Sequence, residues 1–210
     1  ASYQLNICII EKAHDVATGA SAANSAIVHA GYDAKEGSLK AKLNVRGSEM
    51  MEETCRELGV KYKRNGSLVV GFNDDDKAHL EELLVRGTKN GVKGLRVIEK
   101  DEMLALEPNL NPELACALLA TTSAIVCPYE LCMASIGNAM DNGVSLKCDF
   151  AVSKIEKCEN GYNVVANYLN SEVEIKTLVG IYSSSGNFRN TFKRIQARIS
   201  RKIQGLKVYI

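Results

Sequence analysis

A single carboxylate, a run of small polar residues and a histidine follow one another near the start of the chain. Glu11 comes directly after an apolar run at residues 5–10, and His29 lies in the apolar run "IVHAGY". The residues between them are mostly Ala, Gly, Ser, Thr and Asn. Such residues can bring backbone amides close to a phosphate or a flat ring without steric cost. Their types and order are compatible with one side of a dinucleotide-binding site.

Glu11 is the residue with the best-defined possible role. In a dinucleotide-binding unit, an acidic residue at the end of the second strand accepts hydrogen bonds from ribose hydroxyls, and a glycine-rich turn about 20 residues earlier approaches the pyrophosphate. Only ten residues precede Glu11, and they contain no such turn. We therefore expect the phosphate-binding turn to lie outside this sequence. On Glu11 alone, a solvated strand end is the more frequent alternative.

His29 also has two interpretations. A lone histidine in an apolar run is usually a core residue whose imidazole is hydrogen-bonded. Beside a flavin it would instead tune the ring or act on the substrate. The residues alone leave both open.

The pattern of apolar residues predicts a mixture of strands and helices. Residues 5–10 are rich in Ile and predict a strand buried on both faces, as in a parallel sheet. Apolar residues recur at helical spacing over 39–58, and Gly59 stands where a helix ends. Pro128 is placed to open a helix, and Asp101 to cap another. The other predicted elements are a strand at 66–72, helices at 75–91, 101–108 and 128–143, and successive strands within 144–184 with a hairpin turn at Asn160–Gly161.

The order of these elements and the composition define the class of protein. A strand, a long helical insert and a meander of strands predict an α/β (α+β mixed) fold. The chain has 26 basic and 25 acidic residues, which gives no overall field for nucleic acid. No apolar run approaches the roughly 18 residues that span a bilayer, and the start lacks the regions of a signal peptide, so we expect a cytoplasmic location. The seven cysteines include no CxxC pair and predict reduced core residues and no metal site.

Several collinear segments resemble one family. The region 9–47, "IIEKAHDVATGASAANSAIVHAGYDAKEGSLKAKLNVRG", is similar to the region after the first βα unit in FAD-dependent oxidoreductases of the D-amino-acid-oxidase superfamily. It is most similar to the branch that contains FAD-dependent glycerol-3-phosphate dehydrogenases and L-2-hydroxyglutarate dehydrogenases/oxidases. The resemblance continues through "ELGVKYKRNGSLVVGF", "NGVKGLRVIEKDEMLALEP", "AIVCPYEL" and "NAMDNGVSL", and covers about residues 1–165.

The resemblance implies a domain organisation. It predicts a partial FAD-binding Rossmann-like domain at 1–38 and 144–188, which lacks its first strand and glycine loop. Residues 39–143 would form a helical excursion and part of a mixed-sheet substrate domain. The chain is then expected to be truncated at both ends. Residues 189–210 are predicted to be a basic amphipathic tail that packs as a surface helix, meets an anionic membrane or a partner, or does not belong to the family sequence.

The resemblance also assigns roles to individual residues. Glu11 is expected to bind the adenosine ribose of FAD, and Val152 to hold the adenine through main-chain groups. The residues expected along the pyrophosphate and the flavin are Thr18, Gly19, Ser21, Asn24 and Ser25. His29 and Gly31 are expected beside the isoalloxazine, and Gly186 at a second contact with FAD.

The activity implied is the dehydrogenation of a small anionic hydroxy substrate. Glycerol 3-phosphate is the leading substrate, followed by L-2-hydroxyglutarate and a small amino acid, and the electron acceptor is left open. His29 is the candidate catalytic base. The sequence departs from the family at Ala22 and Ala26, where Gly is frequent, and at Cys127, where Asp is usual. An inactive remnant domain, or an adaptor that binds a membrane or partner through the tail, is the alternative to an enzyme.

Overall fold

The computed structural model describes residues 5–180. The chain divides into two compact units, the first containing residues 1–20 and 144–210 and the second containing residues 21–143. Unit 1 and unit 2 are considered separately below.

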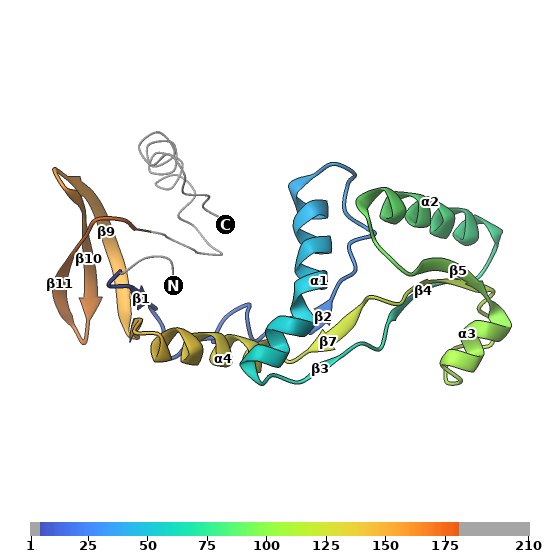
Figure 1. The fold of residues 1–210 in the computed structure, drawn as a ribbon, viewed down its shortest axis with the longest axis horizontal. Helices are drawn as coiled ribbons and strands as arrows, with labels where there is room; N and C mark the ends of the chain where they lie inside the picture. Colours follow the sequence, from blue (N-terminus) through green and yellow to red (C-terminus); the bar gives the residue numbers. More distant parts are fainter. Residues whose placement is uncertain (1–4, 181–210) are drawn as a thin grey trace. The chain divides into compact units, whose positions relative to one another are not determined.

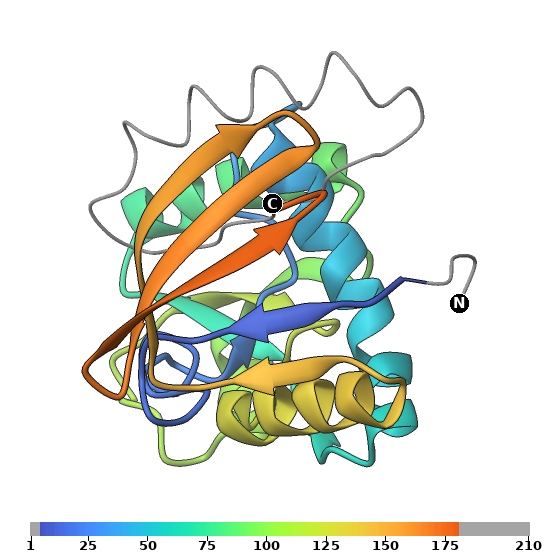
Figure 2. The same cartoon turned by 90° about the vertical axis from the view of Figure 1, so that its left-hand side faces the viewer.

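Unit 1 contains a parallel pair of strands. β1 (Cys8–Ile10) pairs with β8 (Ser145–Lys147) in the register Cys8↔Ser145, and Figure 2 shows the two strands side by side. The predicted strand and its parallel pairing are confirmed. The prediction that it is buried on both faces is wrong, because Cys8 is exposed and Ile9 and Ile10 are half-buried. Among the described residues β8 is the only strand beside β1, so these side chains keep contact with solvent.

The rest of unit 1 is an antiparallel meander, drawn in orange in Figure 2. It consists of β9 (Phe150–Cys158), β10 (Gly161–Tyr168) and β11 (Ser171–Thr177), with β10 in the centre. The predicted hairpin is confirmed, but its turn lies one residue earlier than predicted: Glu159 and Asn160 join β9 to β10, and Gly161 already pairs with Cys158. Leu169 and Asn170 join β10 to β11 with φ values of 47° and 66°, the left-handed conformation that suits a tight hairpin.

A strand that is buried along its whole length forms the centre of unit 2. All five residues of β6 (Cys116–Ala120) are buried, between β4 (Ser67–Gly71) and β5 (Leu95–Glu99) in an antiparallel sheet. α2 (Asp74–Asn90) packs Leu80 and Leu83 on one face, and α3 (Lys100–Leu106) packs Met103 on the other (Figure 1). The continuous apolar sequence of β6 follows from this burial on both faces.

A second sheet in unit 2 is small and has one covered face. Its strands are β2 (Ile27–Val28), β7 (Ala124–Val126) and β3 (Tyr62–Lys63), with β7 in the centre. Val28, Ala124 and Val126 form its inner face, which packs against α1 (Leu39–Leu58) and α4 (Pro128–Asp141). Cross-strand partners share a face. Ile27, Ile125 and Lys63, which pair in one row, therefore form the outer face.

The helix ends follow the capping signals with one exception. α1 ends at Gly59, which is left-handed at φ 68°, and α4 begins at Pro128 as predicted. Asp101 does not cap α3, because Glu99 is at the N-cap position and makes no side-chain cap hydrogen bond. Asp101 lies instead in the first turn, where a carboxylate is favourable because it faces the positive end of the helix dipole.

The cysteines do not all lie in the core. All seven are free thiols, but only Cys55 and Cys116 are buried, and burial raises the pKa of both. Cys8, Cys127 and Cys158 are exposed, so for these the core prediction is wrong. An apolar run does not by itself bury each of its members.

Two helical glycines allow a test of the packing in unit 2. A Cβ at Gly87 of α2 would lie 2.5 Å from Leu95 Cδ2 and 2.7 Å from Tyr32 Cβ, whereas a Cβ at Gly47 of α1 meets nothing within 4 Å. Gly87→Ala should lower the free energy of unfolding by about 1–3 kcal/mol because it overpacks a filled contact. Gly47→Ala should raise it by up to about 1 kcal/mol through helix propensity. Urea denaturation checks both, and equal effects would contradict the packing described.

Candidate functional site

Glu11 lies at the carboxyl end of β1 and is fixed by the backbone around it. Its N–H donates to Lys147 O at 2.9 Å, and its carbonyl accepts from Phe150 N at 2.9 Å. Its side-chain Oε1 accepts from Ala13 N at 2.9 Å. The Oε2 atom accepts no hydrogen bond from the described residues, so this half-buried carboxylate has an oriented oxygen left to bind a ligand hydroxyl.

Residues 147–152 lie beside Glu11 in unit 1. Asp149 N donates to Ala13 O at 2.9 Å, which extends the ladder begun by β1 and β8. The Phe150 ring stacks on Tyr168 with centroids 4.3 Å apart, and Lys147 Nζ lies 5.7 Å from the Phe150 centroid. Val152 is two residues further along β9, half-buried, and pairs with Ala166 at a bulge in the meander. Glu11 and the strand that bears Val152 therefore belong to one rigid part of unit 1.

The charges around Cys148 show how acidic this part is. Partial burial raises the pKa of the Cys148 thiol, and the carboxylates of Asp15, Asp149 and Glu11 raise it further. A thiol in this environment stays protonated at neutral pH and is a poor nucleophile. The structure thus gives Cys148 no catalytic character, and the acidic surroundings favour hydroxyl donors over a second anion.

The loop that follows Glu11 presents small residues to solvent. It has no regular secondary structure, and Val16 is its buried anchor. Asn24 Oδ1 accepts from Ala26 N at 2.9 Å, which shapes the turn before β2. The predicted ligand residues in this loop are all exposed: Thr18 and Gly19 in unit 1, and Ser21, Asn24 and Ser25 in unit 2.

His29 follows β2 and is exposed. Val28 and Ala30 on either side are buried, so alternation along the extended chain turns the imidazole outward. The interpretation of His29 as a core residue is therefore wrong. On the outer face of the small sheet, Ile27 and Ile125 are 43% and 40% exposed. This part of unit 2 therefore combines an exposed apolar surface, formed by Ile27 and Ile125, with an imidazole that can accept a proton.

Gly31 has a packing reason for being glycine. It is buried with φ 105°, and a Cβ there would lie 2.9 Å from Val45 Cγ2 of α1. The contact with α1 thus explains the residue type without a ligand. The predicted contact of Gly31 with the isoalloxazine stays a prediction. Gly186 and the tail at 189–210 lie outside the described residues.

Residues 5–180 also bear on two other kinds of site. They contain no group of three or more His, Cys, Asp or Glu side chains that could hold a metal ion. No helix in this part of the chain is long and apolar enough to cross a membrane.

Comparison with known proteins shows the family. Residues 1–181 match the family described as "FAD dependent oxidoreductase" (DAO). The chain belongs to this family. Its FAD-dependent oxidoreductase fold and the mixed α/β class predicted from the sequence are confirmed, and FAD is the cofactor of the family.

The matches cover most of this chain. The chain, however, spans less than half the length of each of these relatives. Glycerol 3-phosphate dehydrogenase of Caloramator mitchellensis is 44% identical over 167 residues, which are 80% of this chain and 35% of the relative. Mitochondrial L-2-hydroxyglutarate dehydrogenase of Pongo abelii is 31% identical over 84% of this chain and 42% of the relative. FAD-bound L-alpha-glycerophosphate oxidase of Mycoplasma pneumoniae matches the structure with a TM-score of 0.74 and 30% identity, over 80% of this chain and 44% of the oxidase.

The residues present fit FAD in three respects. Glu11 offers a free, oriented acceptor for a ribose hydroxyl. The loop residues Thr18 to Ser25 expose small side chains, as an approach to a pyrophosphate requires. The outer face at Ile27 and Ile125 offers apolar surface for an aromatic ring. Sequence reasoning missed that Ile125 pairs with Ile27 and that the 147–150 segment lies beside Glu11, because strand register cannot be read from either segment alone.

The backbone at Ala26 is strained, and substitution of this residue tests the strain. Ala26 has φ 60°, a left-handed conformation that costs an L-residue about 1–2 kcal/mol. Ala26→Gly relieves this strain but also makes the unfolded chain more flexible, which destabilises the fold. The net effect should be a rise in the free energy of unfolding of about 0.5–1 kcal/mol. Ala22→Gly, at a position without positive φ, should lower it by about 0.4–1 kcal/mol. Thermal and urea denaturation compare the two, and a loss of stability in both variants would contradict the strained backbone.

Proposed function

We propose that this chain is part of an FAD-dependent dehydrogenase that oxidises a small anionic hydroxy compound. Glycerol 3-phosphate is the leading substrate and dihydroxyacetone phosphate its product. The observation that carries the proposal is the 44% identity to a glycerol 3-phosphate dehydrogenase over 80% of this chain. The exposed His29 beside an apolar sheet face supports it, because this arrangement suits proton transfer next to a bound ring.

FAD binding would use the residues that the family resemblance assigns to it. Glu11 accepts hydrogen bonds from the adenosine ribose through the oxygen that Ala13 leaves free. Val152 holds the adenine through its main chain, and Gly186 makes a second contact. The residues along the pyrophosphate and the flavin are Thr18, Gly19, Ser21, Asn24, Ser25 and Gly31.

His29 would act as the base. When bound, FAD supplies the acceptor for the hydride from the substrate's alcohol carbon. The imidazole of His29 takes the hydroxyl proton, so that the alcohol becomes a ketone. Ile27 and Ile125 cover the ring and keep water away from it. The electron acceptor that reoxidises the flavin is left open.

L-2-hydroxyglutarate is the second candidate substrate. It is favoured by the 31% identity to L-2-hydroxyglutarate dehydrogenase of Pongo abelii. Both compounds carry an anionic group close to a secondary alcohol, so the same hydride and proton transfers apply. An amino acid is the third candidate, since the fold is shared with glycine oxidase of Geobacillus kaustophilus at a TM-score of 0.69 and 21% identity.

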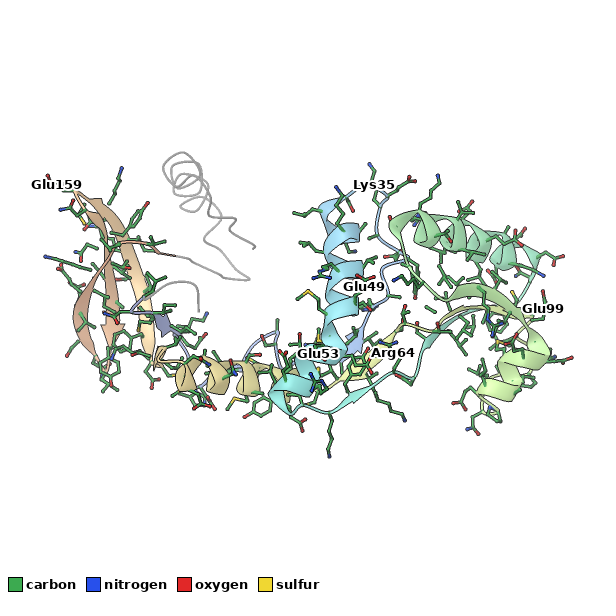
Figure 3. The ribbon with its side chains drawn as sticks, viewed as in Figure 1. Lys35, Glu49, Glu53, Arg64, Glu99 and Glu159 are labelled. Atoms are coloured by element: carbon green, nitrogen blue, oxygen red, sulfur yellow. The ribbon has the colours of Figure 1, made fainter. Side chains whose placement is uncertain are left out.

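Titration of FAD into the purified chain tests the cofactor site. The wild-type chain should bind FAD with micromolar affinity and quench its fluorescence. Glu11→Gln should weaken binding about tenfold or more, because it removes the charge that strengthens a hydrogen bond to a hydroxyl. Glu159→Ala, at the exposed hairpin tip labelled in Figure 3, is the matched control and should bind as the wild type does.

Two outcomes would count against this site. Absence of binding by the wild-type chain would restrict the proposed flavoenzyme to the full-length protein. For this chain alone it would leave an inactive remnant, or an adaptor that works through the tail at 189–210. Equal weakening by Glu11→Gln and Glu159→Ala would show that binding does not use Glu11.

The substrate is tested by anaerobic reduction of the flavin in the full-length protein. Glycerol 3-phosphate should bleach the flavin absorbance fastest, ahead of L-2-hydroxyglutarate and glycine. His29→Ala should slow bleaching about 100-fold or more, in the range of a lost general base, while FAD stays bound. If only L-2-hydroxyglutarate bleaches the flavin, L-2-hydroxyglutarate becomes the leading substrate in place of glycerol 3-phosphate.

A further inference from the structure

The segment after His29 is held between α1 and α2. We call residues 30–34 the strap; it runs from β2 toward α1 and passes beside α2 (Figure 1). Ala30 and Ala34, at its two ends, are 2% and 3% exposed. Ala30 packs in a cluster with Val92 and Ala120. The two ends of the strap are therefore buried in unit 2, although Asp33 within it and His29 next to it are exposed.

One side chain binds the strap at two points. Asn90 Nδ2 donates to Gly31 O at 3.1 Å and to Ala34 O at 2.7 Å, across more than fifty residues of sequence. These two carbonyls fix the orientation of the amide, because the reverse orientation would set Oδ1 against both oxygens. Asn90 Oδ1 is buried and accepts no hydrogen bond from the described residues. Burial of this unpaired oxygen lowers the stability of the fold, and the two hydrogen bonds that Asn90 Nδ2 donates offset the loss.

Two glycines allow the strap to approach this closely. A Cβ at Gly31 would lie 2.9 Å from Val45 Cγ2, and a Cβ at Gly87 would lie 2.7 Å from Tyr32 Cβ. Gly31 thus lets the strap lie on α1, and Gly87 lets it lie on α2. The remaining freedom of the strap is removed by the Asn90 amide.

Asn90 itself is fixed by the way α2 ends. It is the last residue of α2, and Gly91 follows in a left-handed conformation at φ 90°. Gly91 N donates to Thr88 O at 3.0 Å and Val92 N to Gly87 O at 2.9 Å, the pattern of a Schellman cap with Val92 buried after it. The sequence "NG" therefore ends the helix and places the amide at a defined point.

We propose that Asn90 is a positioning residue for His29, acting through the strap. Val28 is fixed by its pairing with Ala124 of β7, and Ala30 begins the strap. His29 lies between these two fixed residues, so its backbone has little freedom to rotate the imidazole inward or along the sheet. Asn90 holds the second of the two restraints, and this inference rests on the proposed role of His29 beside the flavin.

The three histidines of the chain make a direct test possible by NMR. With ¹³C-labelled histidine, the ring signals of His29 report the proposed effect. His14 is a control in unit 1, and His79 on α2 controls for damage to the helix that carries Asn90. Each signal is assigned from the corresponding His→Gln variant.

The main variant is Asn90→Asp, which keeps the shape of the side chain and replaces the donor by a carboxylate oxygen. Asn142→Ala is the matched control, because Asn142 Nδ2 donates at 2.8 Å to Asn138 O of its own helix and not to the strap. Asn90→Asp should shift and broaden the His29 signals and leave His14 and His79 unchanged. Hydrogen exchange of peptides over residues 28–36, which include Lys35, labelled in Figure 3, should quicken about tenfold or more. Peptides over β6 should stay protected.

The outcomes separate this inference from the proposed function. Unchanged His29 signals in Asn90→Asp would overturn the inference, even where strap exchange quickens, because Asn90 would then be a structural residue only. Failure of the wild-type chain to bind FAD would overturn the proposed function for this chain, while the His29 signals would still decide the positioning role. With FAD bound, Asn90→Asp should shift the flavin absorbance in the same direction as His29→Ala. If Asn90→Asp fails to fold, Asn90→Gln keeps a donor on a longer side chain and should give a smaller shift of the His29 signals, and no shift would overturn the inference.

Discussion

The burial of β6 on both faces is the constraint on which unit 2 depends. A strand with five buried residues needs an apolar layer on each face, and α2 and α3 supply these layers with Leu80, Leu83 and Met103. Once α2 is fixed on this sheet, its C-terminal end is fixed as well. Asn90 and Gly87 at that end define where the strap can lie. In the positioning role proposed for Asn90, the orientation of the exposed His29 therefore depends on the burial of a core strand.

The sequence predicts those elements whose signals are local. α1 and α4 begin and end close to the predicted residues, since apolar spacing, Gly59 and Pro128 act within a few residues of the boundary. The stretch from 115 to 126 shows the limit, because β6 and β7 are both apolar and belong to different sheets. Which sheet a strand joins depends on partners far away in sequence, and periodicity carries no information about them.

The same limit explains the outcome at the candidate site. The resemblance indicated the family, and the match over residues 1–181 confirmed it. His29 was ambiguous because an apolar run surrounds it, and only the pairing of Val28 with β7 and the burial of Ala30 show which way the imidazole points. Asn90 carried the weak signal "NG", which is typical both of a hairpin turn and of a helix end. Its two hydrogen bonds to the strap join residues that no local pattern connects.

The structure also separates two kinds of small residue that look alike in sequence. Gly31 and Gly87 are buried, and a Cβ at either would lie within 3 Å of a neighbouring atom, so packing explains them without any ligand. Gly19 has nothing within 4 Å of its Cβ position, and Ser21 and Ser25 are exposed. Packing against the described residues does not explain why these three residues are small. A bound ligand does, because only short side chains let its phosphates reach the backbone amides. The exposed small residues therefore support the proposed cofactor site, and the buried ones support the proposed positioning of His29.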